Sequence, residues 1–272
     1  SGSYGDYTEP HDAMLIPARL EEVDLDLYLQ FDTGAPSTML YGNSLESLME
    51  QGLVVEILQE GDNRFVRELT MTLGGSEVRM EMIRILDGYG GDISQEESSK
   101  IGTIGADFLL PYLTEINFRD RVIQQYLSRE SWMTDQQSFE SFEFAGRRLM
   151  LPCVLDGKEL SLFYDSGSSA FGLITTPGRY ERYSLNDGPE IAYSTNSWGN
   201  QLSIQHKETA YAMVMNDQSI PLRRVSYVNM YAGLQGLMTP FTSIGGWLGN
   251  KPFLGYSLIL DVAKEEFVIV FP

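Results

Sequence analysis

Hydrophobic and polar positions alternate along this chain in short runs, which is the pattern of half-buried β-strands. The clearest runs cover residues 23–31 and 160–164, and the Asp-Gly dipeptide at 156–157 is a strong signal for a hairpin turn before the second run. Helical spacing is rare. One short helix is predicted over 44–51, and another is predicted to begin at 176–177. The pattern therefore predicts an all-β fold.

The predicted elements occur in the same order in two halves of the chain. Each half has a strand, an alternating strand, an Asp-Thr/Ser-Gly tripeptide, a hairpin, a glycine-containing apolar segment and a last hairpin. These elements occupy 15–20, 23–31, 32–34, 70–82, 101–109 and 114–123 in the first half, and 150–155, 160–164, 165–167, 212–222, 246–254 and 258–269 in the second. Two unrelated β-rich halves would not share this order, so an internal duplication is predicted.

The duplication indicates where the domains lie. We expect an N-terminal lobe over 1–127, a polar and acidic linker over 128–144, and a C-terminal lobe over 145–272. A length of 272 residues is sufficient for two modest lobes.

Composition narrows the classes of partner. The chain has 19 Lys and Arg against 38 Asp and Glu, a net charge of −19 that repels nucleic acid and anionic lipid surfaces. The apolar runs are too short for a membrane-spanning segment. The single cysteine, Cys153, allows no internal disulfide, and two histidines form no cluster for a soft metal. We expect no metal, no cofactor and no nucleic-acid partner.

The compartment remains open at this stage. The chain begins Ser1-Gly2-Ser3 without methionine, which indicates processing or an expression scar, and a removed export signal would not be visible. An extracytoplasmic location, periplasmic or secreted, is the preferred alternative, and the two-lobed chain is expected to act as a monomer.

The two aspartates carry the predicted chemistry. The chain has no Walker-A, His-Glu-x-x-His or Gly-x-Ser-x-Gly motif, and two histidines leave little for a Ser/His/Asp triad. If the lobes pack with pseudo-two-fold symmetry, Asp32 and Asp165 meet at the axis and share one proton, because two adjacent like charges do not both ionise. The ionised carboxylate can then activate a water while the protonated one donates to an attacked carbonyl oxygen.

The residues next to each aspartate support this interpretation. Gly34 and Gly167 let the backbone turn sharply beside each carboxylate. Thr33 and Ser166 are predicted to form hydrogen bonds with the opposite strand, which would fix the separation of the carboxylates.

Residues 31–38 and 163–169 resemble the two active-site motifs of the aspartic peptidases, and the closing steps at 103–105 and 247–249 resemble the hydrophobic-hydrophobic-glycine step of that family. The first closing step departs slightly, with Thr103 in place of a larger apolar residue. The resemblance covers nearly the whole chain. It implies a bilobal pepsin-like fold of two homologous β-barrel-like lobes with a central cleft, an extended peptide or unfolded polypeptide as substrate, and amide hydrolysis without a cofactor. The short lobes resemble a tandem retropepsin-like form.

One departure from the family pattern concerns the residue after each motif. Ala35 replaces a serine that often follows the first motif, whereas Ser168 keeps a hydroxyl in the second. One donor fewer near Asp32 weakens the stabilisation of its ionised form, so we expect a working pH less acidic than that of pepsin.

A second departure concerns the lid over the cleft. The segment expected to form the first-lobe flap, 55–69, contains Phe65 but no tyrosine. Its second-lobe counterpart, 190–205, contains Tyr193 and a turn with Trp198. We name Phe65, Tyr193 and Trp198 as candidate substrate-binding residues, with core packing as the equal alternative for Trp198.

Three other residues are assigned ordinary roles. His206 is expected at the surface, and Cys153 is expected to be a small buried hydrophobe. Asp107 is expected to cap a surface turn, with support of the site as the less favoured alternative.

The sequence thus predicts an aspartic endopeptidase with Asp32 and Asp165 as its catalytic pair. A catalytically silent peptide-binding module that keeps the cleft is the first alternative, because the flap tyrosine is missing. A structural β-protein in which each aspartate only caps a turn is the second, and it leaves the repeated motif unexplained.

Overall fold

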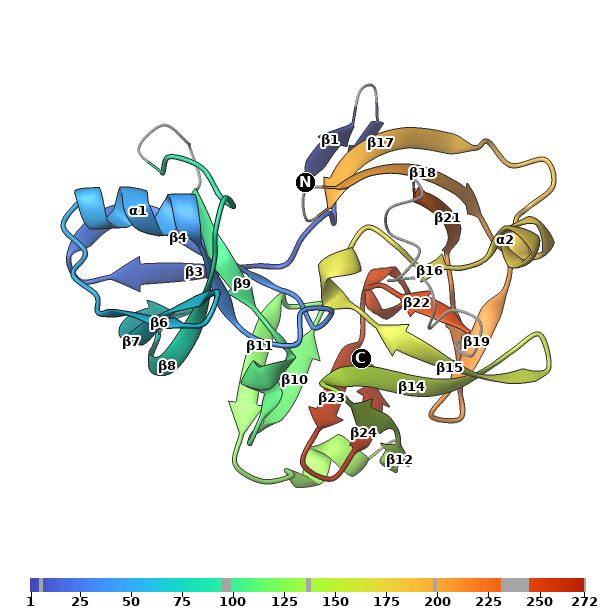
Figure 1. Cartoon of the computed structure of the whole chain (residues 1–272). Coiled ribbons are helices and arrows are strands. Elements are labelled where there is room, and N and C mark those ends of the chain that lie inside the picture. The colour runs from blue at the N-terminus through green and yellow to red at the C-terminus, as the bar shows by residue number, and fades with distance from the viewer. Residues whose placement is uncertain (5–6, 94–98, 136–137, 198–199, 231–244, 272) are drawn as a thin grey trace. The chain divides into compact units, whose positions relative to one another are not determined.

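Most of the regular structure in the chain is β-strand (Figure 1). The computed structural model describes residues 1–4, 7–93, 99–135, 138–197, 200–230 and 245–271. Within these ranges there are two α-helices, Gly42–Glu50 (α1) and Pro177–Tyr183 (α2), close to the two predicted positions. The predicted all-β class is confirmed.

The strands form two compact units. Residues 14–108 make up the inserted unit, while residues 1–13 and 109–272 together make up the main unit. These boundaries differ from the predicted lobes of 1–127 and 145–272 at both ends of the first lobe.

The inserted unit is one sheet with the strand order β3-β4-β9-β5-β8-β7-β6, and an additional pairing between β3 and β7 closes it into a barrel. Its strands are Leu15–Leu20 (β3), Val23–Phe31 (β4), Met39–Tyr41 (β5), Ile57–Glu60 (β6), Asn63–Leu73 (β7), Ser76–Leu86 (β8) and Ser99–Ile104 (β9). The alternation predicted over 23–31 is observed: Leu27, Leu29 and Phe31 are buried, while Asp24 and Asp26 are exposed. The apolar face of β4 therefore fills the barrel and brings Asp32 to the end of a rigid strand.

The main unit contains a ten-stranded sheet with the path β17-β18-β21-β16-β22-β15-β14-β19-β20, and β13 pairs with β14 beside it. Its strands are Glu143–Ala145 (β13), Arg148–Leu155 (β14), Lys158–Tyr164 (β15), Leu173–Ile174 (β16), Ile191–Ser197 (β17), Asn200–Glu208 (β18), Ala212–Met215 (β19), Gln218–Pro221 (β20), Arg224–Met230 (β21) and Gly246–Leu248 (β22). A small N-terminal hairpin, Gly2–Tyr4 (β1) and Tyr7–Glu9 (β2), belongs to the same unit.

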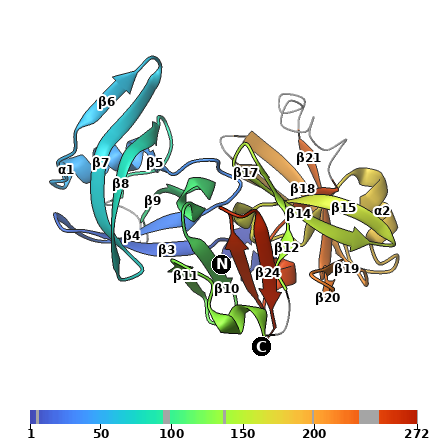
Figure 2. The same cartoon turned by 90° about the horizontal axis from the view of Figure 1, so that it is seen from below.

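A five-stranded sheet in the main unit joins the last hairpins of both halves of the sequence (Figures 1 and 2). Its order is β11-β10-β23-β24-β12, with the strands Leu113–Asn117 (β10), Val122–Tyr126 (β11), Glu140–Ser141 (β12), Ser257–Asp261 (β23) and Glu266–Val270 (β24). Strand β10 pairs with β23 along its whole length. The hairpin that ends the first half is therefore part of the main unit, which explains why the boundary falls at 108 and not at 127.

The predicted linker has structure of its own. The 3₁₀ turn Ser131–Thr134 (η2) places Met133 in a buried cluster with Leu113, Ile259 and Val268, and β12 pairs with β24. The η2 turn thus packs on the five-stranded sheet, and β12 extends that sheet at its edge.

The two halves repeat one topology. Strand β4 pairs in parallel with β9, and β15 pairs in parallel with β22. In both halves, the short strand after the aspartate (β5 or β16) pairs antiparallel with the closing strand and in parallel with β8 or β21. The long strands β7 and β8 correspond to two shorter pieces each in the second half, β18 with β19 and β20 with β21. The predicted duplication is confirmed at the level of strand pairing.

Candidate active site: two aspartate turns

Asp32 lies in a buried turn at the end of β4, inside the inserted unit. Its backbone N–H donates to Ile104 O on β9 at 3.0 Å, which continues the parallel pairing one residue beyond the strand. Within the turn, the N–H of Gly34 donates to Asp32 Oδ1 at 2.9 Å and the N–H of Ala35 donates to Asp32 O at 3.1 Å. The carboxylate, in a residue only 7% exposed, is therefore held by the backbone of its own motif.

Asp165 lies in the corresponding turn of the main unit. Its N–H donates to Leu248 O on β22 at 3.0 Å, the equivalent of the bond from Asp32 to Ile104. Asp165 Oδ1 accepts from the N–H of Gly167 at 2.9 Å and from that of Ser168 at 3.3 Å, while Oδ2 accepts from the Ser168 hydroxyl at 2.7 Å. The same turn is thus built twice, with one additional hydroxyl donor in the second copy.

The hydroxyl residues after the aspartates are fully buried: Thr33 and Ser166 are both 0% exposed. This burial fits a structural role within the two motifs. Their predicted hydrogen bonds to the opposite strand remain a prediction.

At the closing glycines, the backbone of a neighbouring segment lies too close for a side chain. A Cβ on Gly105 would lie 2.4 Å from the carbonyl carbon of Ser37, and a Cβ on Gly249 would lie 2.2 Å from the carbonyl oxygen of Ser168. Both distances are far shorter than any tolerated contact, and backbone atoms cannot yield. The hydrophobic-hydrophobic-glycine step is therefore a packing requirement of each aspartate turn.

Asp107 supports the first turn. Its carboxylate accepts from the N–H of Thr38 at 2.8 and 2.9 Å and from the Thr38 hydroxyl at 2.8 Å, and that hydroxyl accepts from the N–H of Gly105 at 3.2 Å. These bonds join the loop after Asp32 to the segment after β9. The sequence favoured a surface cap for Asp107, and the structure instead supports the alternative, a support of the site.

Tyr41 also belongs to the surroundings of Asp32. It is buried, and its hydroxyl lies 2.8 Å from Thr103 Oγ1. Burial raises the pKa of the Tyr41 hydroxyl, and the negative charge of Asp32 raises it further, so Tyr41 stays neutral and available as a donor.

The candidate flap residues have different outcomes. The segment 55–69 contributes to a hairpin of β6 and β7 that turns at Gly61-Asp62, and Phe65 on β7 is half-buried. Tyr193 on β17 stacks on Tyr7 with ring centroids 5.6 Å apart, so its ring is packed within the main unit. Trp198 lies outside the described residues. The substrate-binding roles of all three remain predictions.

Tyr7 belongs to a buried ionic cluster that the sequence analysis did not identify. Glu9, 0% exposed, lies between Lys251 Nζ at 2.8 Å and Arg224 Nη1 at 2.9 Å, and it also accepts from the Tyr7 hydroxyl at 2.6 Å and from the N–H of His11 at 3.2 Å. Burial alone would raise the pKa of Glu9. The hydrogen bonds from Lys251, Tyr7 and His11 outweigh burial and lower that pKa to about 2. This cluster fixes the N-terminal segment to the main unit.

His206 lies beside that cluster. The expectation that it is a surface residue is wrong: it is 0% exposed and packed among the rings of Tyr7, Tyr193 and Phe171. Its Nδ1 lies 3.3 Å from Ser226 Oγ, and its Nε2 has no hydrogen-bond partner among the described residues. Burial, with the nearby charge of Arg224, lowers the pKa of His206 to about 3.

Cys153 is buried as expected. Burial, with the charge of Glu140, raises the pKa of the Cys153 thiol to about 12. The thiolate that nucleophilic catalysis requires is therefore strongly disfavoured at this position.

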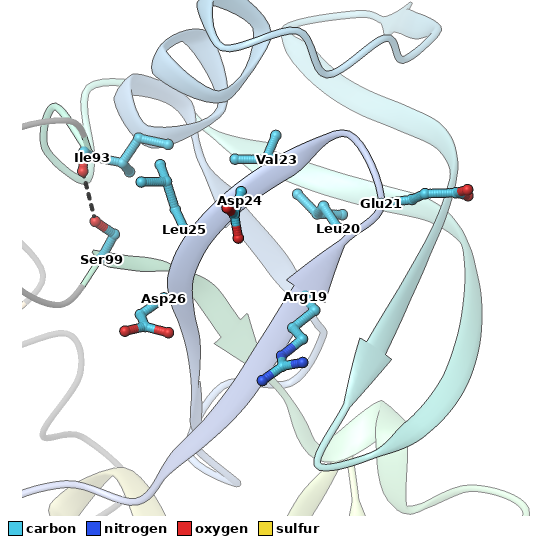
Figure 3. A pocket seen from close by; sticks show the side chains of 9 residues that line it. All are labelled: Arg19, Leu20, Glu21, Val23, Asp24, Leu25, Asp26, Ile93 and Ser99. Carbon is cyan, nitrogen blue, oxygen red and sulfur yellow. Dashed lines mark hydrogen bonds between the residues drawn. The ribbon is translucent and has the colours of Figure 1, made fainter.

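A pocket of about 670 Å³ lies on the β3–β4 hairpin of the inserted unit (Figure 3). Its described lining residues are Arg19, Leu20, Glu21, Val23, Asp24, Leu25, Asp26, Ile93 and Ser99. The Ser99 hydroxyl donates to Ile93 O at 3.0 Å along one side. None of the predicted site residues is among these lining residues.

Two further observations concern metals and membranes. In the described part of the chain, no group of three or more His, Cys, Asp and Glu side chains is arranged to hold a metal ion. No helix within the described ranges is long and apolar enough to cross a membrane.

Comparison with known proteins adds no relative. No protein-family model matches the chain, and no curated protein matches it significantly. The functional assignment therefore depends on the motifs and on the geometry of the two turns.

Proposed function

We propose that this chain is an aspartic endopeptidase of the pepsin-like, two-lobed kind, with Asp32 and Asp165 as its catalytic pair. The observation that carries the proposal is the repetition of one aspartate turn. In each copy the aspartate N–H bonds to the closing strand and Oδ1 accepts from the motif glycine at 2.9 Å. If each aspartate only ended a strand, there would be no reason for the same hydrogen-bonded turn to occur in both halves of the chain.

The proposed reaction uses the two carboxylates with one shared proton. One ionised carboxylate removes a proton from a water whose oxygen attacks the peptide carbonyl carbon, while the protonated carboxyl donates to the carbonyl oxygen. The tetrahedral intermediate collapses when the C–N bond breaks: the first carboxyl gives the proton it took from water to the leaving nitrogen, and the second takes a proton back from a hydroxyl of the intermediate. The carboxyl groups then have one proton between them, as at the start, and no cofactor is needed.

The substrate class follows from the same proposal. An extended peptide or unfolded polypeptide presents its amide bonds to a pair of acids, whereas a folded chain does not. The net charge of −19 favours neutral or basic segments over acidic ones as substrates.

The catalytically silent peptide-binding module remains the second candidate. One observation favours it. Tyr193, the tyrosine of the second-lobe flap candidate, stacks on Tyr7 and contacts the ring of His206, so its ring is already engaged in packing. A binding module would keep both turns and bind a statine-type inhibitor without cleaving peptides.

The test is cleavage of an unfolded, disulfide-free protein from roughly pH 3 to pH 7, because a carboxylate pair sets both limbs of the profile. Asp32→Asn and Asp165→Asn should each reduce the rate by roughly 10²–10⁴-fold. Asp26→Asn on the exposed face of β4 and Asp187→Asn at an exposed position of the main unit are the matched controls, and both should keep wild-type activity. Inhibitor binding without turnover would select the module. Activity that survives either motif substitution would refute both motif-based candidates.

A further inference from the structure

Two buried polar side chains, Tyr164 and Asn250, form hydrogen bonds that support the turn carrying Asp165. The hydroxyl of Tyr164 donates to Asn250 Oδ1 at 2.8 Å, and Asn250 Nδ2 donates to Ser166 O at 3.0 Å and to Ser169 Oγ at 2.7 Å. Tyr164 is 0% exposed and Asn250 is 2% exposed. Neither residue was singled out by the sequence analysis.

These contacts act on a single peptide group. The carbonyl of Ser166 and the N–H of Gly167 are the two ends of one amide. Asn250 donates to the carbonyl end, and the N–H end donates to Asp165 Oδ1 at 2.9 Å. Hydrogen bonds in such a chain polarise one another, each strengthening the next by roughly 10–30%.

The first donor of the chain stays protonated. Burial, with the negative charge of Asp165, raises the pKa of the Tyr164 hydroxyl well above its ordinary value. Tyr164 is therefore a neutral donor throughout the acid and neutral range, and the chain of bonds does not depend on its titration.

The same two positions differ in the first half of the sequence. Phe31 occupies the position before Asp32, and Ala106 occupies the position after the closing glycine. Neither side chain carries a polar hydrogen, so this pair of donors is not repeated at the corresponding positions.

We infer that Tyr164 and Asn250 are positioning residues that hold the Asp165 carboxylate through the polarised Ser166–Gly167 peptide. The inference rests on the proposed function for its kinetic part only. A hydrogen bond that strengthens toward the carboxylate fixes its orientation. Asp165 is then the carboxylate that these two side chains hold in place for the proposed reaction.

The primary test is Tyr164→Phe in the full chain, because this change removes one oxygen and keeps the ring that packs against Phe253. The matched control is Tyr180→Phe, which removes the hydroxyl that donates to Glu190 at 2.9 Å from helix α2 of the same unit. Asn250→Ala is the stronger change and serves as a second variant where it folds.

The first readout is the amide proton of Gly167 in the nuclear magnetic resonance spectrum, which requires no activity. Its resonance should move upfield in Tyr164→Phe, because a less polarised N–H is less deshielded, and it should not move in Tyr180→Phe. A Tyr164→Phe protein with lower thermal stability and an unchanged Gly167 resonance would overturn the inference, since the hydroxyl would then be structural only.

The second readout is peptide cleavage. Tyr164→Phe should lower kcat by roughly 3–10-fold, the value of one modest hydrogen bond, with little change in KM. Equal kcat values for Tyr164→Phe and Tyr180→Phe would overturn the inference. A wild-type protein that cleaves nothing would refute the proposed function, and the Gly167 resonance would still decide the inference.

Discussion

Lys251 Nζ lies 2.8 Å from Glu9 Oε1, so a residue two places after the second closing glycine forms an ion pair with the N-terminal segment. Asp107 holds the equivalent position in the first half and contacts its own turn. One position of the repeat thus supports a turn in one copy and anchors the start of the chain in the other.

Glu9→Gln should destabilise the main unit. The substitution removes the only negative charge in direct contact with Lys251 and Arg224 among the described contacts of the cluster, which leaves two largely buried cations without compensation. We expect a loss of roughly 3–5 kcal/mol in the free energy of unfolding, measured by denaturant titration at neutral pH. Glu159→Gln on the exposed part of β15 is the control and should change the stability by less than about 0.5 kcal/mol.

The ionic cluster also predicts acid lability. The pKa of Glu9 is lowered from 4.5 to about 2, so its contribution to stability is present above pH 4.5 and is lost as the pH falls toward 2. The contribution amounts to about 3 kcal/mol. Unfolding free energies measured between these pH values should fall faster in the wild type than in Glu9→Gln. Parallel curves would show that Glu9 does not titrate as described.

The buried His206 predicts a second pH range in which the folded protein loses stability. Its pKa is lowered from 6.5 to about 3 in the folded protein, so the stabilisation is complete above pH 6.5 and is lost as the pH falls through that range. One proton contributes a slope of about 1.4 kcal/mol per pH unit. His206→Phe, which preserves the aromatic packing, should flatten the stability curve between pH 6.5 and pH 3, whereas His11→Gln, at a partly exposed site, should keep most of the slope.

Asp107→Ala should impair the first turn. Thr38 would lose the acceptor for its N–H and its hydroxyl, which costs about 1–3 kcal/mol of stability. If the proposed function holds, kcat should fall by at least roughly 10-fold, because small displacements of a catalytic group have large effects. Asp107→Asn keeps one acceptor oxygen and should recover part of both losses. An Asp107→Ala enzyme with normal kcat would show that the contact does not position Asp32.

The closing glycines should not accept alanine. A Cβ at Gly105 or Gly249 would meet backbone atoms at 2.4 or 2.2 Å, so each substitution should destabilise by about 1–3 kcal/mol or prevent folding. Gly178 in α2 is the matched control, because a Cβ there meets nothing within 4 Å. Gly178→Ala should be neutral or stabilise by up to about 1 kcal/mol, as judged by thermal unfolding.

Local patterns in the sequence were sufficient to predict the strands and the repeat. The alternation over 23–31 is visible because every second residue faces the barrel, and the motif around Asp32 is visible because its glycine and hydroxyl recur around Asp165. Each of these signals lies within a few residues. The hydrophobic periodicity of a strand and the residue types of a turn can both be recognised within such short stretches of sequence.

Contacts between distant residues were not predictable in this way. Glu115 accepts a hydrogen bond from the hydroxyl of Ser257, which lies 142 positions later in the sequence. The two residues belong to the paired strands β10 and β23, and because of this pairing the unit boundary lies at 108 and not at the predicted 127. Glu9 is buried between Arg224 and Lys251, which come from distant parts of the chain. His206 is buried among the rings of Tyr7, Tyr193 and Phe171. A charged residue or a histidine carries no local mark of burial, since its environment is supplied by the folded chain.

The pairing of β10 with β23 bears on how such a chain can be divided. A break at the sequence midpoint, between the two copies of the repeat, would split a continuous sheet and strip each product of strands it needs for its hydrogen bonds. Excision at 14 and 108 would instead remove one whole barrel and leave that sheet intact. The two copies in the sequence and the two compact units of the structure therefore have different boundaries, and a design that divides or recombines this protein should use the boundaries of the compact units.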